Sequence, residues 1–108
     1  MASDFGELAR QLAGVDRIIH EPARTLIITI LYTVESSDFI YLQRETGLTK
    51  GNLSSHLSKL EEAGYIEIEK TYRGKIPLTL CRLSPDGRRA YEVYRKQLKQ
   101  IIDGPAKG

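Results

Sequence analysis

The sequence is poor in residues that carry catalysis, metal binding or covalent cross-links. Its 108 residues include one cysteine, Cys81, and two histidines, His20 and His56. A single cysteine excludes an internal disulfide and a thiolate metal cluster within one chain. No stretch has the roughly 20 apolar residues of a membrane span, and the first residues lack the charged start and apolar core of a signal peptide. We therefore expect a cytoplasmic protein without membrane contact, metal or other cofactor.

A strong overall charge is also missing, since the net charge is only +2. The charge is unevenly distributed, however. Residues 49–108 hold twelve of the sixteen basic residues, whereas residues 1–48 are acidic overall. A local basic excess favours a polyanionic partner, although it is weak support by itself.

The segment 47–65 has the pattern of one short helix with both ends marked. Thr49 is a good N-cap, and Gly64 can adopt the left-handed conformation that ends a helix. Leu53, Leu57 and Leu60 recur at the spacing of one buried helix face. The opposite face carries short polar side chains and two cations, which suit the major groove of DNA, although a solvated surface would have the same pattern.

Three more helices are expected before this one. Residues 5–14 have an amphipathic pattern, and residues 21–34 are apolar almost all round, with Pro22 at the first helical position. The β-branched run within 25–30 could also form a strand, but Pro22 and the length favour a helix. We expect Glu35–Asp38 to be a turn that caps a helix over 39–46, and Gly47-Leu48-Thr49 then joins two helices as in a helix-turn-helix.

After Gly64 the apolar period changes from helical to alternating. Residues 65–70 and 76–83 are predicted to form two strands, joined by a basic turn at 72–75, with Pro77 near the start of the second strand. Ser84-Pro85-Asp86 then begins a last helix, which Gly104-Pro105 ends.

This order predicts a mainly α protein with a small β-hairpin (α+β), namely a winged helix-turn-helix with extra N- and C-terminal helices. The expected units are an N-terminal helix (1–18), the winged helix (19–84) and a C-terminal helix (85–108). The outer helices carry more apolar surface than a small core can cover, which favours a dimer interface, unless they fold back on their own domain. The predicted interface residues are Phe5, Leu8, Leu12, Tyr94, Leu98, Ile101 and Ile102.

Several motifs resemble the small prokaryotic winged-helix transcriptional regulators related to the MarR and ArsR groups. The resemblance covers about Ile19 to Leu98. It is carried by His20-Glu-Pro-Ala-Arg24, Asp38-Phe39, Gly47–Leu57, Leu60-Glu-Glu-Ala-Gly-Tyr65 and Leu83-Ser-Pro-Asp-Gly87. It implies a homodimer that binds a roughly palindromic operator in double-stranded DNA and has no catalytic residues.

The resemblance also bears on effectors. ArsR-type metal sensing uses paired cysteines and histidines, and the single cysteine and distant histidines here argue against it. MarR-type regulators often bind small aromatic acids, but the sequence identifies no small-molecule effector.

In this interpretation the helix at about 49–63 enters the major groove by its N-terminal end, and the wing at 71–76 lies on the minor groove or backbone. A plain solvated turn is the alternative for the wing. The predicted DNA contacts are Thr49, Lys50, Asn52, Ser54, Ser55, Ser58, Lys59, Arg73 and Lys75.

The sequence leaves two other functions as alternatives. A protein-interaction module without DNA binding is possible because the recognition face is only mildly basic and four acids follow it closely. A small enzyme is disfavoured because no acid is spaced to orient His56. His56 is expected to be structural rather than a metal ligand, His20 to help cap the helix at 21–34, and Cys81 to be a small buried residue rather than a redox sensor.

Overall fold

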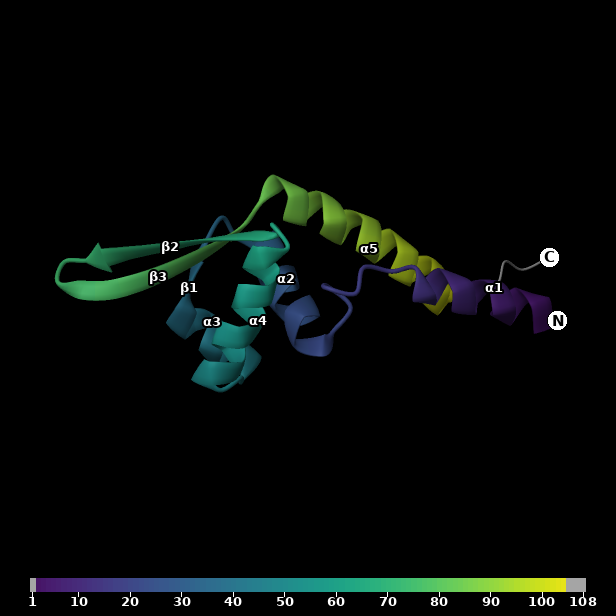
Figure 1. The fold of residues 1–108 in the computed structure, drawn as a ribbon, viewed down its shortest axis with the longest axis horizontal. Coiled ribbons are helices and arrows are strands. Elements are labelled where there is room, and N and C mark those ends of the chain that lie inside the picture. Colours follow the sequence, from purple (N-terminus) through teal and green to yellow (C-terminus); the bar gives the residue numbers. More distant parts are fainter. Residues whose placement is uncertain (1, 105–108) are drawn as a thin grey trace.

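The computed structural model describes residues 2–104, which form five helices and a three-stranded sheet (Figure 1). The fold class predicted from the sequence is confirmed, because most of the chain is helical and the sheet is small. The elements are α1 (Ala2–Ala13), α2 (Pro22–Thr33), β1 (Ser37–Asp38), α3 (Phe39–Thr46), α4 (Lys50–Glu62), β2 (Ile66–Arg73), β3 (Ile76–Leu83) and α5 (Pro85–Asp103). Pro105, which the sequence predicts at the end of the last helix, lies outside the described residues.

Side-chain caps mark the starts of α2, α3, α4 and α5. Asp38 accepts a hydrogen bond from the Tyr41 backbone N–H (2.7 Å) at the start of α3, and Ser84 accepts one from Gly87 (2.9 Å) at the start of α5. These contacts satisfy backbone donors that have no partner within the helix. At α2 the capping side chain is Glu21, so the expectation that His20 helps to cap this helix is wrong.

The sheet is antiparallel with the strand order β1-β3-β2. The sequence predicted Glu35–Asp38 as a turn, and the structure corrects this, because Ser37 and Asp38 pair with Cys81 and Leu80 of β3. A two-residue strand is too short to show an alternating pattern, so its pairing partner decides it.

The core lies between α2, α3, α4, the base of the hairpin and the first half of α5. From α2 it takes Ile27, Ile28 and Leu31, all fully buried, so the segment 25–30 is helical and the strand alternative is wrong. Full burial of one such side chain contributes about 1.5–3 kcal/mol. The core therefore holds the inner face of α4 firmly and leaves its other face to solvent.

The molecule is long and thin, with principal extents of 62 × 26 × 21 Å. Figure 1 shows the β2–β3 hairpin projecting at one end, while α1 lies alongside the outer half of α5 at the other. Within residues 2–104 no helix is long and apolar enough to cross a membrane.

Candidate nucleic-acid interface

The helix-turn-helix is formed by α3, the turn Gly47-Leu48-Thr49 and α4. Gly47 ends α3 with φ of 70°, a left-handed conformation that glycine adopts without steric cost. Thr49 caps α4 by accepting a hydrogen bond from the Asn52 backbone N–H (3.1 Å). The predicted turn is therefore present, and it presents the N-terminal end of α4 to solvent.

The two faces of α4 differ as the sequence predicted. Leu53, Leu57 and Leu60 are buried in the core. Every predicted contact residue on the other face is exposed and could reach a ligand without rearrangement of the core. These residues are Thr49, Lys50, Asn52, Ser54, Ser55, Ser58 and Lys59.

The C-terminal end of α4 is closed by hydrogen bonds to its last carbonyl groups. The Tyr65 N–H donates to the Leu60 carbonyl (3.0 Å) and the Gly64 N–H to that of Glu61 (2.9 Å), with Gly64 at φ of 80°. This is the Schellman pattern. Glu61 and Glu62 are exposed at this end, which is the end opposite the capped N-terminus.

His56 links α4 to the beginning of α2, in agreement with its predicted structural role. Its Nδ1 lies 3.2 Å from Nη1 of Arg24 and 3.4 Å from Oε2 of Glu21. Arg24 also donates through Nε to the carbonyl of Ile18 (2.6 Å). The side chain of His56 is largely covered, so these contacts fix the orientation of α4.

The wing is a tight hairpin with Gly74 and Lys75 at its tip. Arg73 pairs with Ile76, and Gly74 has φ of 64°. A two-residue connection that begins with a left-handed glycine is typical of a type II′ turn, which matches the twist of the strands. Arg73 and Lys75, the predicted wing contacts, are both exposed.

Lys70 is a further exposed cation of the wing, outside the set of predicted DNA contacts. Ile66 and Ile68 point toward the core, and by strand alternation Lys70 shares their face of β2 while being exposed. The interrupted alternation was a signal that could have identified it. Beyond Ile68 this face therefore leaves the core and carries an exposed cation, Lys70.

Two of the four acids that follow the recognition face lie on the other face of the hairpin and are paired. Arg82 donates through Nη2 to Oε1 of Glu69 (2.8 Å), and its Nη1 lies 3.9 Å from Oε1 of Glu67. The Glu69 hydrogen bond raises the pKa of Arg82. The acids of β2 are therefore partly neutralised, which weakens the argument against a polyanionic partner.

Asp16 joins the segment after α1 to the base of the wing. Its carboxylate accepts the hydroxyl hydrogen bond of Tyr65 and the backbone N–H of Ile18 (2.8 Å) and Ile19 (3.1 Å). The bond to Asp16 and partial burial raise the pKa of Tyr65 to about 12. This contact fixes the end of α4 relative to the chain that leads back to α1.

The residues predicted for a dimer interface have different environments. Phe5 (67% exposed) and Ile102 (73%) are open to solvent, and Leu12 is partly so. Tyr94, however, is buried in the core, with its hydroxyl 2.8 Å from Nδ1 of His20. It contributes to the packing of its own chain. Leu8, Leu98 and Ile101 are half-buried.

Cys81 is fully buried in β3, as expected for a small apolar residue. Burial is the main cause that raises the pKa of its thiol to about 11, and the charges of Glu61 and Asp38 add to it. A thiol held protonated is a poor nucleophile. Within residues 2–104 no cluster of histidine, cysteine and acidic side chains could hold a metal ion.

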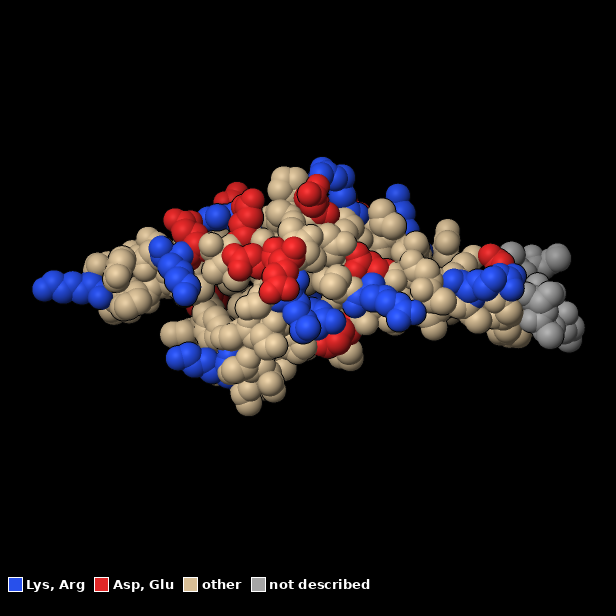
Figure 2. All heavy atoms as spheres, viewed as in Figure 1, with Lys and Arg blue, Asp and Glu red and all other residues tan. Residues whose placement is uncertain are grey.

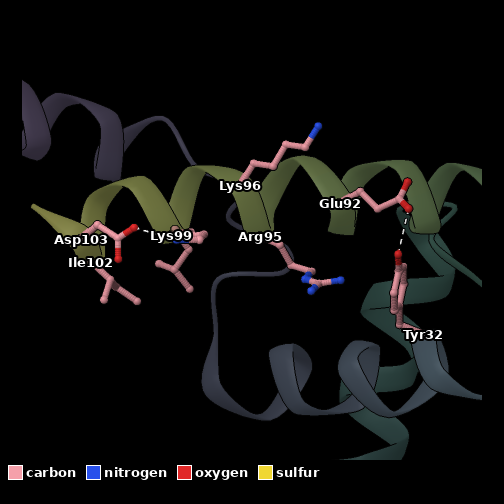
Figure 3. Close-up of a pocket in the computed structure, with 8 residues that line it drawn as sticks. Tyr32, Glu92, Arg95, Lys96, Lys99, Ile102 and Asp103 are labelled. Carbon is pink, nitrogen blue, oxygen red and sulfur yellow. Dashed lines mark hydrogen bonds and ion pairs between the residues drawn. The ribbon is translucent and has the colours of Figure 1, made fainter. Parts of the chain in front are cut away.

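A hollow of about 750 Å³ lies between the end of α2 and the outer half of α5 (Figure 3). The hydroxyl of Tyr32 donates to Oε2 of Glu92 (2.8 Å), and the Arg95 guanidinium lies 5.4 Å from the centre of the Tyr32 ring. The lining mixes cations, acids and apolar side chains, so its charge does not select one class of ligand. The remaining lining residues are Lys96, Leu98, Lys99, Ile102 and Asp103.

Comparisons with known proteins agree with this geometry. The sequence profile of the winged helix DNA-binding domain matches residues 23–102. An uncharacterized protein of Methanocaldococcus jannaschii is 35% identical over 86 residues, which cover 79% of this chain and 92% of that protein.

Two solved structures are similar over almost the whole chain. A transcriptional regulator homologue from Pyrococcus horikoshii has a TM-score of 0.78 and 26% identity, covering 94% of this chain and 95% of that one. A MarR family transcriptional regulator from Silicibacter pomeroyi has a TM-score of 0.64 and 17% identity, covering 95% and 66%, and this likeness concerns the fold alone.

The exposed polar face of α4, its capped N-terminal end and the basic wing are the parts that a DNA-binding winged helix needs. The profile match adds that the chain is related to DNA-binding proteins and not to enzymes. The protein belongs to the winged helix DNA-binding domain family.

Proposed function

We propose that the protein is a transcriptional regulator that binds specific sequences of double-stranded DNA as a homodimer. In this proposal α4 lies in the major groove, where Asn52 reads a base edge and Lys50 contacts the backbone near the helix N-terminus. The observation that carries the proposal is the uninterrupted exposed face of α4, which has neither an acid nor a large apolar side chain between residues 49 and 59.

The wing supplies the second DNA contact in the proposal. Arg73 and Lys75 are exposed at the hairpin tip and would lie on the minor groove or the adjacent backbone. Neutralised phosphates release counterions, so binding should weaken steeply with salt.

The DNA contacts can be tested once selection from a random duplex pool has provided a binding site. We expect the double variant Lys50→Ala with Arg73→Ala to lose binding in gel shifts, because both the backbone contact of α4 and the wing contact are removed. The fold should be unaffected, since both side chains are exposed.

A matched control removes two cations from α5, by Lys96→Ala with Arg89→Ala, and should keep most of the affinity. Equal affinity of the Lys50/Arg73 variant and the native protein would refute the DNA-binding mode. Association with a protein partner that is insensitive to salt, without DNA retention, would favour an interaction module instead.

The homodimer in the proposal rests on the arm formed by α1 and α5. These helices pack on each other at the end of the molecule away from the wing (Figure 1) and still leave the side chains of Phe5 and Ile102 about 70% exposed. Exposed apolar surface of this kind marks an interface. A twofold dimer would present two copies of α4 to half-sites separated by whole turns of DNA.

Sedimentation tests this arrangement. Phe5→Glu with Ile102→Glu should produce monomers, because it places four carboxylates in the twofold contact. The control Ile40→Glu alters an equally exposed residue on α3 and should leave the oligomeric state unchanged. A dimer that survives the first change would show that another surface carries the association.

A further inference from the structure

The tip of the wing carries two large apolar side chains that neither the core nor the proposed dimer covers. Tyr72 is 70% exposed and Ile76 is 67% exposed. Figure 1 shows the hairpin end at the opposite end of the molecule from α1 and the outer half of α5. A second copy docked on that arm would therefore leave the wing tip open.

The strand register places these side chains on opposite faces of the tip. Tyr72 is paired with Pro77, and Arg73 is paired with Ile76. Cross-strand partners share a face, and neighbouring pairs point to opposite faces. One face of the tip is therefore formed by Tyr72 with Pro77 and the other by Ile76 with Arg73.

Cations surround this apolar pair. Lys70, Arg73 and Lys75 are all exposed, and the acids Glu67 and Glu69 lie nearer the base of the hairpin, where Arg82 pairs with them. Figure 2 shows basic and uncharged side chains at the hairpin end in this view, with the acidic ones set back from it. The partner of this tip should therefore combine apolar surfaces with negative charge.

A narrow slot with apolar walls and anionic rims fits these features. The minor groove of B-DNA is about 6 Å wide, and apolar side chains are used by many proteins that enter it. Its walls are deoxyribose rings from the two strands, and phosphates line its edges. A hairpin tip with one apolar side chain on each face could touch both walls while its cations meet the rims.

We propose that Tyr72 and Ile76 are DNA-contacting residues that pack on the deoxyribose walls of the minor groove beside each half-site. This inference rests on the proposed function and specifies how the wing takes part in it. Arg73 and Lys75 supply the electrostatic attraction, whereas Tyr72 and Ile76 supply apolar contact on both strands. That contact depends on groove shape rather than on base-edge hydrogen bonds.

The test compares Tyr72→Ser, Ile76→Ser and the double variant with the native protein on its selected duplex. Each single change removes one apolar contact from each half-site and should lower the affinity of the dimer about a hundredfold, or about tenfold for each buried apolar side chain lost. The slope of log affinity against log salt should stay unchanged, whereas Arg73→Gln, which removes one cation from each protomer, should reduce it by about 1.8. Ile40→Ser, which removes an equally exposed apolar side chain from α3, is the matched control and should bind normally.

Hydroxyl-radical footprinting gives a direct measurement, because these radicals attack deoxyribose that is exposed in the minor groove. The native protein should protect sugars on both strands where the wing lies, and the double serine variant should lose that protection while keeping protection at the major-groove site. Tyr72→Phe and Ile76→Val should retain both the affinity and the footprint, because they keep the apolar surface.

The results separate this inference from the function on which it depends. A native protein that binds no duplex would overturn both. Native binding with unchanged affinity and footprint in the double serine variant would overturn only the wing contact. A reduced salt slope in the serine variants would also overturn it, since the side chains would then act by positioning the nearby cations. Loss of self-association in the serine variants would assign the tip to protein contacts instead.

Discussion

Replacement of Gly87 by alanine should destabilise the packing of α5 on the winged helix-turn-helix. Gly87 is buried in the first turn of α5, where this helix crosses the backbone between α4 and β2. An added Cβ would lie 2.0 Å from the carbonyl oxygen of Tyr65 and 2.9 Å from Cδ1 of Leu83. These distances are far inside the roughly 3.5 Å of an ordinary contact. The backbone at Tyr65 or the start of α5 must therefore move.

The size of the effect follows from two opposing terms. Alanine in a helix gains at most about 1 kcal/mol over glycine. Overpacking costs about 1–3 kcal/mol, and here the upper end applies because the obstacle is backbone. The Tyr65 carbonyl also accepts the Ser84 N–H (3.0 Å), so moving it weakens a second contact. We expect a net loss of about 2 kcal/mol, which corresponds to a Tm lower by roughly 8–16 °C.

Thermal and urea unfolding at equal protomer concentration measure this effect, since dimerisation makes the Tm depend on concentration. Gly51→Ala is the matched control. Gly51 lies in the first turn of α4 with nothing within 4 Å of an added Cβ, so this variant should be as stable as the native protein or slightly more stable. If Gly87→Ala unfolds at the native temperature, the close packing of α5 on Tyr65 is refuted.

Two further predictions concern titratable groups. The pKa of Tyr65 is raised from 10.0 to about 12, so the stability from its bond to Asp16 is complete below pH 10 and is lost as the pH rises to about 12. Tyr65→Phe should be about 1 kcal/mol less stable than native at pH 7, and urea unfolding should show this gap closing between pH 10 and 12. A gap that does not change with pH would contradict the role of the hydroxyl. Because Cys81 is buried with a pKa of about 11, it should resist a disulfide reagent at pH 8 until the chain unfolds. Rapid reaction of the native protein would show that β3 opens at this position.

Local patterns in the sequence predicted most of the fold. Helix α4 has its cap at Thr49, a leucine stripe and a terminal glycine, all within one segment, so its bounds and its two faces could be predicted without the rest of the chain. The same holds for the hairpin turn, because Gly74 and the alternation on either side act over a few residues. Exposure of the predicted contact face followed directly, since a helix with one apolar stripe can bury only that stripe.

The remaining features depend on residues that are far apart in sequence. Tyr94 has the spacing of an exposed apolar stripe, yet it is buried in the core of its own chain, where its hydroxyl lies near His20, 74 residues away. The strand at Ser37 exists only because β3 offers a pairing edge. Helical spacing and alternation tell which side chains share a face, but they do not tell what covers that face.

The sequence by itself therefore determined the helix-turn-helix and the wing hairpin, because each is a local structure specified by its own residues. Only the tertiary structure decided how these parts are connected to α5 and what the wing can touch. The buried contact of Gly87 with Tyr65 arises from packing between residues far apart in the sequence, and the opposite placement of Tyr72 and Ile76 arises from the strand register, which the alternating pattern alone leaves open.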